Sequence, residues 1–186
     1  ERLGLIPQID MWVLDRVMQL LSARPDVSIA VNLSARSIAR PSFLEQVEAK
    51  VASSSIGQGR LCFEITETAA MGNVSEVRVW MNRMKALGCS FAIDDFGAGH
   101  SAISYLYELP VDVVKIAGNV VQSMRGDSSS KLIIEAINSV SHVLGAKTVA
   151  ECVEDEECLK VLQDMGIDFA QGYYFARPMP ADEAVA

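Results

Sequence analysis

The feature of this sequence that most constrains its fold is a repeated alternation between short β-type segments and segments with helical spacing. Between two β-type segments, apolar residues recur every three or four positions, as Ile133, Ile137 and Val140 do. Alternation of this kind is typical of parallel strands joined by helical crossovers. Strands are expected at residues 28–34, 61–66, 90–95, 113–117, 148–153 and 169–175, with helices at 9–20, 43–52, 74–87, 101–109, 133–144 and 155–165.

Composition places the chain among folded domains and excludes some functions. Half of its 186 residues are apolar, too many for a disordered segment, and no linker divides them, so one domain is expected. The formal net charge of −8 disfavours a nucleic-acid polymer as partner, because phosphate contacts need a basic surface. Without a signal peptide, a long apolar run or a CxxC pair, a cytoplasmic domain with reduced thiols is expected.

Polar residues at the strand ends discriminate between two α/β architectures. A doubly wound sheet concentrates its site where the strand order reverses, whereas a barrel gathers residues from many strand ends into one mouth. Here polar groups follow every expected strand, which favours a (β/α)8 barrel. The residues at or just past these ends are Asn32, Ser34, Glu64, Glu67, Asp94, Asp95, Lys115, Glu151, Glu154 and Gln171.

Side-chain alternation within the strands agrees with a barrel. Ala30 and Asn32 share one strand face, while Val31 and Leu33 form the other, which we expect to pack on helices. A complete barrel has eight strands and typically about 250 residues. We therefore expect a (β/α)8 barrel of which residues 1–186 supply six βα units, strands 3–8, as one partial domain whose first two strands precede residue 1.

The acidic residues at the strand ends would crowd the mouth around a single cation, Lys115. Like charges a few ångströms apart repel by several kcal/mol even at an effective dielectric constant of about 20. Carboxylate and amide oxygens without a His or Cys cluster are typical ligands of Mg²⁺ or Mn²⁺, which would neutralise them. The pair Asp94-Asp95 could present one carboxylate to each of two ions, the usual device for displacement at phosphorus. Lys115 could orient or help deprotonate the attacking water, or stabilise phosphoryl charge.

Two other interpretations account for fewer of these residues. The segment Gly97-Ala98-Gly99 loosely matches a dinucleotide-binding fingerprint, but Asp94 and Asp95 before it would repel a pyrophosphate. A flexible loop that closes over a site fits the segment better. A retaining glycosidase could use Glu64 and Glu151 as carboxylates about 5 Å apart, which leaves the other acids and the lysine without roles.

At these residues the sequence resembles the EAL domain family of bacterial cyclic di-GMP phosphodiesterases, which is built on a modified TIM barrel. The resemblance is collinear and covers essentially the whole chain. The motifs that carry it are, in order, Val31-Asn32-Leu33-Ser34-Ala35-Arg36, Glu64-Ile65-Thr66-Glu67, Asp94-Asp95-Phe96-Gly97-Ala98-Gly99, Leu109-Pro110-Val111-Asp112, Lys115-Ile116, Ala150-Glu151-Cys152-Val153-Glu154 and Gln171-Gly172-Tyr173.

The resemblance implies a role for each matched residue. Lys115 and Gln171 would act on the attacking water and the phosphate, and Glu67 would anchor the loop of residues 96–101. The implied ligands of a two-metal Mg²⁺ or Mn²⁺ site are Asn32, Glu64, Asp94, Asp95 and Glu151. The implied substrate-binding residues are Gly97, Gly99, Glu154 and Pro178.

The sequence departs from the family pattern at a few positions. The Glu-Ala-Leu tripeptide, which supplies one metal ligand, would precede residue 1. Ala117 stands where Asp usually follows Lys-Ile, a change that bears on turnover more than on binding. Cys152 replaces the usual Gly, and Ser37 stands where Gln is common.

The function implied is metal-dependent hydrolysis of cyclic di-GMP to linear pGpG in bacterial second-messenger signalling. The alternative is a degenerate EAL domain that binds cyclic di-GMP without hydrolysing it. The resemblance also implies a homodimer formed through EAL domains and fusion to sensor or GGDEF domains. The parent protein would be either free in the cytoplasm or tethered to the inner membrane. Because an incomplete barrel exposes strand edges, the 186 residues alone are expected to be weakly active or inactive.

Overall fold

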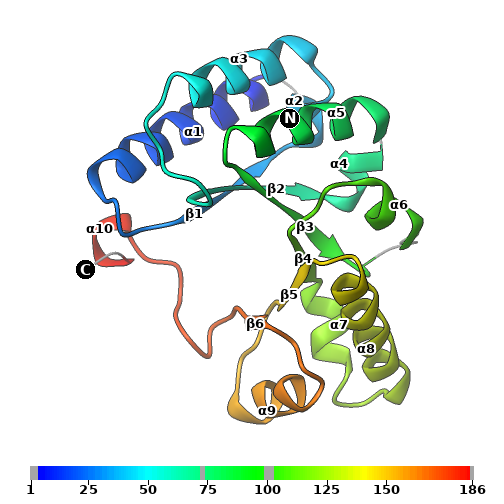
Figure 1. Cartoon of the computed structure of the whole chain (residues 1–186). Helices are drawn as coiled ribbons and strands as arrows, with labels where there is room; N and C mark the ends of the chain where they lie inside the picture. Colours follow the sequence, from blue (N-terminus) through cyan, green and yellow to red (C-terminus); the bar gives the residue numbers. More distant parts are fainter. Residues whose placement is uncertain (1–3, 72–73, 99–102, 185–186) are drawn as a thin grey trace. The chain divides into compact units, whose positions relative to one another are not determined.

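The computed structural model describes residues 4–71, 74–98 and 103–184. Its strands form one sheet in which hydrogen-bonded neighbours follow chain order, β1-β2-β3-β4-β5-β6, as Figure 1 shows. A doubly wound sheet would reverse its order at one point, so this order confirms the barrel-type architecture. Within the described residues, β1 and β6 end the order and the strands do not close a barrel. The strands are β1 (Ile29–Leu33), β2 (Leu61–Thr66), β3 (Ser90–Phe96), β4 (Val113–Ile116), β5 (Lys147–Ala150) and β6 (Phe169–Ala170).

Each strand is followed by at least one helix, which confirms the six expected βα units. Within the described ranges, the helices fall short of the length and apolar character that a membrane span requires. The helices are α1 (Ile6–Ala23), α2 (Ala35–Ile38), α3 (Pro41–Ala52), α4 (Glu67–Met71), α5 (Val74–Ala86), α6 (Ile103–Glu108), α7 (Gly118–Ser123), α8 (Ser128–Val143), α9 (Glu156–Asp164) and α10 (Ala181–Ala184).

The chain divides into two compact units. Unit 1 comprises Glu1–Ile93 and Ser104–Val111, and unit 2 comprises Asp94–Ile103 and Asp112–Ala186. In unit 1, Val31 and Leu33 of β1 are buried while Asn32 between them is exposed, and β2 alternates in the same way. The predicted alternation of the two strand faces is therefore confirmed.

Aromatic contacts form the centre of the unit 1 core. The rings of Phe63 in β2, Trp80 in α5 and Phe91 in β3 have centroids 5.4 to 5.8 Å apart, and none of the three residues is more than 1% exposed. Tilted and edge-on rings at this spacing add to the stabilisation from buried apolar area. This cluster fixes α5 against the sheet beside the strand that carries Glu64.

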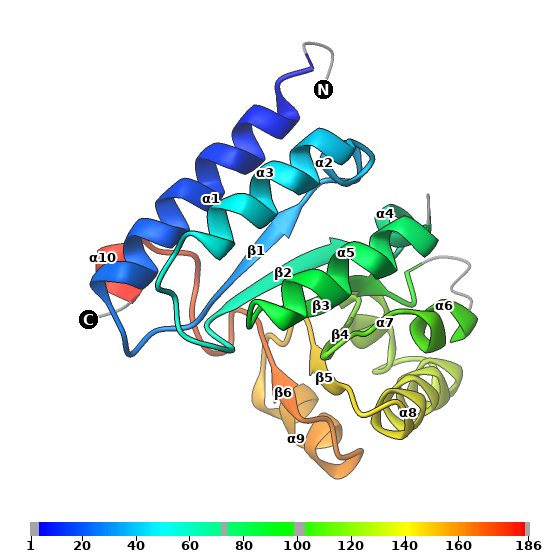
Figure 2. The same cartoon turned by 45° about the horizontal axis from the view of Figure 1, so that its top comes forward.

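Helix α1 is attached to its neighbours by charged side chains. Figure 2 shows α1 and α3 side by side, and Lys50 Nζ of α3 lies 2.5 Å from Asp15 Oδ1 of α1. Arg60, just before β2, donates hydrogen bonds to Leu21 O at 2.9 Å and to Arg24 O at the end of α1. Because the last carbonyls of a helix have no helical partners, these bonds satisfy them and anchor the start of β2.

Unit 2 contains parallel pairs β4–β5 and β5–β6, with α8 packed on β4 and β5. Asp127 accepts a hydrogen bond from Ser129 N, and Asp155 accepts one from Cys158 N, each at 2.9 Å. Aspartate caps of this kind satisfy the first amides of a helix, which explains where α8 and α9 begin. The apolar side chains buried in this unit include those of Phe96, Val114, Ile116, Val121, Met124, Ile134, Ile137, Val153 and Leu162.

Two strands are shorter than predicted, both at their carboxyl ends. The strand expected at 148–153 ends at Ala150, and the strand expected at 169–175 ends at Ala170. Cys152 has φ of 55°, outside the extended region, so β5 cannot continue through it. Gly172 approaches the main chain of Val153 so closely that any Cβ would overlap it, and the chain turns there. Residues expected inside strands therefore form loops at the strand ends.

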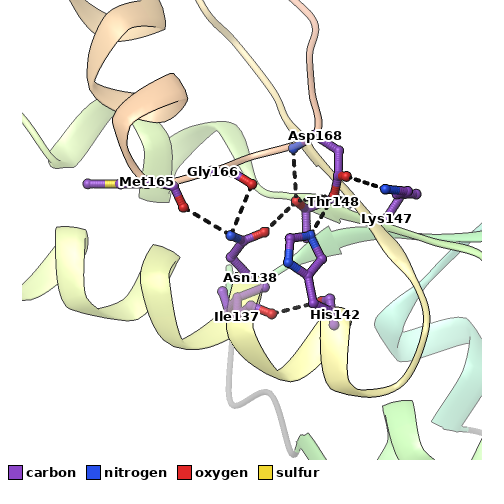
Figure 3. A network of polar contacts seen from close by, with 9 residues as sticks. Ile137, Asn138, His142, Lys147, Thr148, Met165, Gly166 and Asp168 are labelled. Carbon is purple, nitrogen blue, oxygen red and sulfur yellow. Dashed lines mark hydrogen bonds and ion pairs between the residues drawn. The ribbon is translucent and has the colours of Figure 1, made fainter.

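A polar network joins the amino-terminal ends of β5 and β6 to α8, as Figure 3 shows. Asp168, just before β6, accepts hydrogen bonds from Thr148 N at 2.9 Å and from Lys147 Nζ at 2.7 Å, and His142 Nε2 lies 2.7 Å from its Oδ2. Burial by itself would raise the pKa of Asp168. The hydrogen bonds from Lys147, His142 and Thr148 outweigh burial and hold this pKa well below its usual value.

The same network continues into α8 and the segment after α9. The buried Thr148 donates from Oγ1 to Asn138 Oδ1 at 2.7 Å. Asn138 in turn donates from Nδ2 to Met165 O at 3.1 Å and to Gly166 O at 3.3 Å. One strand, one helix and one loop are thus fixed together at the end of the sheet opposite the carboxyl ends.

A carboxylate with a lowered pKa in the folded state stabilises the protein above its unfolded-state pKa, and this stabilisation is lost as the pH falls through the folded-state value. We therefore expect Asp168→Asn to lower the free energy of unfolding at pH 7 by about 1–3 kcal/mol, since three donors lose a charged acceptor. We also expect the variant to lose less stability than the wild type below about pH 4.

Urea unfolding at pH 7 measures the loss of stability, and urea unfolding below about pH 4 measures the change in acid dependence. Asp164→Asn, a substitution of an exposed aspartate on α9, is the matched control. If both variants had the same stability and the same acid dependence, the assignment of Asp168 as a stabilising carboxylate would be wrong.

Candidate active site

Main-chain hydrogen bonds within unit 2 connect the carboxyl ends of successive strands. The bonds run from Ala117 N to Phe96 O at 3.0 Å, from Glu151 N to Ile116 O at 3.2 Å and from Gln171 N to Ala150 O at 2.8 Å. Because these strands are parallel, the residues at their ends form one row along the same edge. The predicted residues Asp94, Lys115, Glu151 and Gln171 are members of this row.

Lys115 is the buried cation of the row. Its Nζ lies 2.8 Å from Asp94 Oδ1 and 2.8 Å from Glu151 Oε1, and its side chain is 7% exposed. The contact with Asp94 is a close ion pair in which Oδ1 is poorly aligned for a hydrogen bond. The structure therefore brings together the lysine and two of the acids that the sequence placed at strand ends.

The pKa of Glu151 is shifted by burial and by the charges of this row. Burial raises its pKa, and the negative charges of Asp94 and Asp95 raise it further, while the hydrogen bond and charge of Lys115 oppose the change. One ammonium thus pairs with two carboxylates, Asp94 and Glu151, and the charge of Asp95 near Glu151 makes the local balance negative. Groups shifted in this way by burial and a specific set of charges are typical of functional sites.

Two residues of this row adopt left-handed backbone conformations that side chains disfavour. Asp95 has φ of 56° and Cys152 has φ of 55°, directly after Asp94 and Glu151 respectively. Such a conformation costs about 1–2 kcal/mol for a non-glycine residue. Strain of this kind concentrates at functional sites, and here it turns the chain away just past each carboxylate. The sequence predicted Asp95 as a site residue but not its left-handed conformation. The Gly that is usual at position 152 in the family that the sequence resembles would adopt this φ without strain.

The predicted site residues of unit 1 lie at the ends of two paired strands. Asn32 of β1 and Glu64 of β2 are register partners, so the amide and the carboxylate stand at the same level of the sheet. Glu67 begins α4, three residues beyond Glu64. Asn32 is exposed, and both glutamates are half-buried.

The predicted substrate-binding residues have more varied surroundings. Gly97 has φ of 92°, and a Cβ there would lie 3.2 Å from Ile137 Cδ1, so the position favours glycine twice. Glu154 is exposed and accepts a hydrogen bond from Gln122 Nε2 at 3.4 Å. Pro178 is exposed in the segment between β6 and α10. Gly99 lies outside the described residues, as does the loop from residue 99 to 102.

The donor chemistry of the row suits a hard cation. Within the described residues, no group of three or more His, Cys, Asp or Glu side chains is arranged to hold a metal ion. The unit 2 carboxylates of Asp94, Asp95 and Glu151 nevertheless outnumber their ammonium partner and offer oxygen atoms alone, which is the ligand type of Mg²⁺ and Mn²⁺. The residues therefore fit such an ion chemically, and their ligand roles stay predictions.

The chain belongs to the EAL domain family. The profile of the EAL domain matches residues 1–178, which confirms the resemblance seen in the strand-end motifs.

Two relatives illustrate the match along the sequence. The chain is 39% identical over 184 residues to the cyclic di-GMP phosphodiesterase PdeB of Shewanella oneidensis, which covers 97% of this chain and 22% of PdeB. It is 36% identical over 191 residues to MucR of Pseudomonas aeruginosa, a bifunctional diguanylate cyclase/cyclic di-GMP phosphodiesterase, covering 100% of this chain and 28% of MucR. The chain thus spans about a quarter of the length of these relatives.

Solved structures show the same fold. The PaMucR phosphodiesterase in its c-di-GMP complex aligns with a TM-score of 0.89 and 34% identity, over 98% of this chain and 76% of that chain. The FimX EAL domain from Pseudomonas aeruginosa bound to c-di-GMP aligns with a TM-score of 0.85 and 26% identity, over 94% of this chain and 72% of that chain.

The side chain of Cys152 is accommodated beside Gly118. A Cβ added at Gly118 would lie well inside van der Waals distance of Cys152 Sγ and would meet Cys152 Cβ at 2.8 Å. We therefore expect Gly118→Ala to destabilise the protein by about 1–3 kcal/mol, the usual cost of overpacking. In a Cys152→Gly background the same substitution should cost less than about 0.5 kcal/mol, because the clash is gone.

Chemical unfolding of the wild type, both single variants and the double variant completes the cycle. Gly126→Ala, at a position where an added Cβ meets no atom within 4 Å, is the control for the change of residue type. Additive effects of the two substitutions would show that Cys152 and Gly118 are not complementary.

Proposed function

We propose that this chain is part of a cyclic di-GMP phosphodiesterase. Water would add to phosphorus, one P–O bond of the ring would break, and linear pGpG would be released in bacterial second-messenger signalling. The observation that carries the proposal is the ammonium of Lys115 held between Asp94 and Glu151 in a chain of the EAL domain family. The names of PdeB and MucR, both phosphodiesterases of this dinucleotide, support it.

The proposal includes Mg²⁺ or Mn²⁺ at the strand ends, in a two-metal site. When bound, such ions supply Lewis-acid stabilisation of the charge that develops at phosphorus. The excess of carboxylates over ammonium groups in unit 2 supports this assignment, because it would be repulsive without a cation. The residues that would hold the ions are Asn32, Glu64, Asp94, Asp95 and Glu151.

Lys115 is the residue best placed to act on the reacting groups. Its two ion pairs fix the position of the ammonium, which is largely buried. A preorganised ammonium can donate hydrogen bonds to a phosphoryl oxygen or orient the attacking water, at little reorganisation cost during the reaction.

The other proposed roles follow from position. Gln171 is held by main-chain bonds to Ala150 and Val153, on either side of Glu151, so we assign it to the attacking water and the phosphate. Glu67 would anchor the loop of residues 96–101. The substrate itself would contact Gly97, Gly99, Glu154 and Pro178.

The proposal also concerns the larger protein in which this chain would work. Because the chain spans 22% of PdeB and 28% of MucR, we propose that it works inside a larger protein with sensor or GGDEF domains. Residues 1–186 would supply strands 3–8 of one EAL-type domain in that protein. We further propose that the domain acts in the cytoplasm and pairs with a second EAL domain in a homodimer.

Lys115→Met tests the proposed chemistry, because it keeps the length of the side chain and removes the ammonium. In the full-length protein with Mn²⁺, we expect kcat for pGpG release to fall by about 10²–10³-fold, the usual loss when one preorganised donor is removed. Chromatography of the nucleotide products measures the rate. Lys160→Met on the exposed side of α9 is the control, and an undiminished rate in Lys115→Met would sink the assignment.

A receptor that binds cyclic di-GMP without hydrolysing it is the second candidate function. The observation that favours it is Ala117, which occupies the N-cap of α7 and is 1% exposed. Aspartate at this position would both cap the helix, worth about 0.5–2 kcal/mol, and place an acid beside the lysine. Retention of Lys115 and its two carboxylate partners favours hydrolysis instead.

Ala117→Asp separates the two candidates. We expect the full-length wild type to release pGpG, and we expect the variant to change kcat by less than tenfold, or about 1.4 kcal/mol. Asn119→Asp adds the same charge in the same turn and is the control. Tight binding by the wild type, with turnover only in Ala117→Asp, would establish the receptor.

A further inference from the structure

One acidic side chain of unit 1 has no part in the proposed chemistry, yet it holds the turn that follows Asn32. Asp10 lies in the second turn of α1, too far from the helix start to cap it. Its Oδ2 accepts a hydrogen bond from Ser34 N at 3.1 Å and another from Ser37 Oγ at 2.6 Å. The carboxylate therefore reaches out of its own helix to the chain that leaves β1.

The two serines of this turn are themselves linked. Ser34 is the N-cap of α2, where its Oγ accepts from Ser37 N at 3.2 Å and donates to Ser37 Oγ at 2.9 Å. Ser37 is fully buried. Hydrogen bonds to a carboxylate are stronger than neutral ones when the carboxylate is ionised. The two bonds to Asp10 connect this network to α1.

The network ends two residues from a proposed metal ligand. Asn32 precedes Leu33 and Ser34 directly and lies in register with Glu64 of β2. Val31 and Leu33, on either side of Asn32, are buried, and the hydrogen bond to Asp10 fixes the main chain at Ser34, so packing and this bond together hold the end of β1. Side chains that orient ligands in this way change metal affinity when they are removed, by 10–100-fold in typical cases.

We infer that Asp10 is a positioning residue for the metal site: through Ser34 and Ser37 it sets the end of β1 and so the place of the Asn32 amide beside Glu64. The inference rests on the proposed function. The inference also gives Ser37 a role, because its hydroxyl donates the hydrogen bond to Asp10. The longer side chain of Gln, which is common at this position in the family, would make this bond differently or not at all.

The test is Mn²⁺ binding by the full-length protein, measured by calorimetry and independent of turnover. We expect Asp10→Ala to weaken Mn²⁺ binding by at least tenfold. Asp10→Asn, which keeps an acceptor oxygen without the charge, should recover part of the affinity. In kinetics, the effect should appear as a higher Mn²⁺ requirement, with kcat at saturating Mn²⁺ changed less than the affinity.

Asp15→Ala is the matched control. Asp15 lies on the same helix and forms an ion pair with Lys50 of α3, away from the β1 turn. We expect Asp15→Ala to lower the melting temperature while leaving Mn²⁺ affinity within twofold of the wild type, a difference of about 0.4 kcal/mol. This contrast separates positioning of the site from a general loss of stability.

The outcomes distinguish the inference from the proposal beneath it. A wild type that hydrolyses cyclic di-GMP, together with a folded Asp10→Ala variant of unchanged Mn²⁺ affinity, would overturn the inference alone. If Asp10→Ala does not fold, Ser37→Ala decides, and unchanged affinity there has the same meaning. A wild type that neither binds Mn²⁺ nor releases pGpG would overturn the proposed function and the inference with it.

Discussion

The arrangement of unit 2 depends on one buried ammonium group. At an effective dielectric constant of about 20, two like charges 4 Å apart repel by about 4 kcal/mol, and Asp94 and Glu151 would oppose each other without Lys115 between them. Its two contacts of 2.8 Å turn that repulsion into attraction. One ammonium cannot neutralise Asp95 as well, so the row keeps a negative charge. A divalent cation could neutralise this charge while it binds a phosphodiester.

The two ends of the sheet in unit 2 have different tasks. At the amino-terminal ends, Asp168, Thr148 and Asn138 satisfy one another and the surrounding main chain, which stabilises the packing of α8 against β5. At the carboxyl ends, polar groups are brought together with strain and unbalanced charge. Barrel-type enzymes commonly separate stability and chemistry in this way, because loops at one end can change without disturbing the other.

Much of the fold and the centre of the candidate site could be predicted from the sequence. Strand positions and the buried face of β1 and β2 follow from a period of two, and Asp94, Lys115 and Glu151 could be placed together because parallel strands end at one edge. The ends of β5 and β6 could not be predicted, since they depend on the left-handed Cys152 and on the contact of Gly172 with Val153. The metal-ligand and substrate-binding roles remain predictions.

The sequence by itself determined the βα repeat, the membership of the EAL domain family and the chemical character of the strand ends, because periodicity and motif spacing are local properties of the chain. Only the tertiary structure decided which partners those residues meet. The ion pairs of Lys115, the fit of Cys152 against Gly118 and the bonds from Asp10 to Ser34 and Ser37 join segments that are distant along the chain. Such contacts depend on three-dimensional packing, and the spacing of residues along the chain does not predict them.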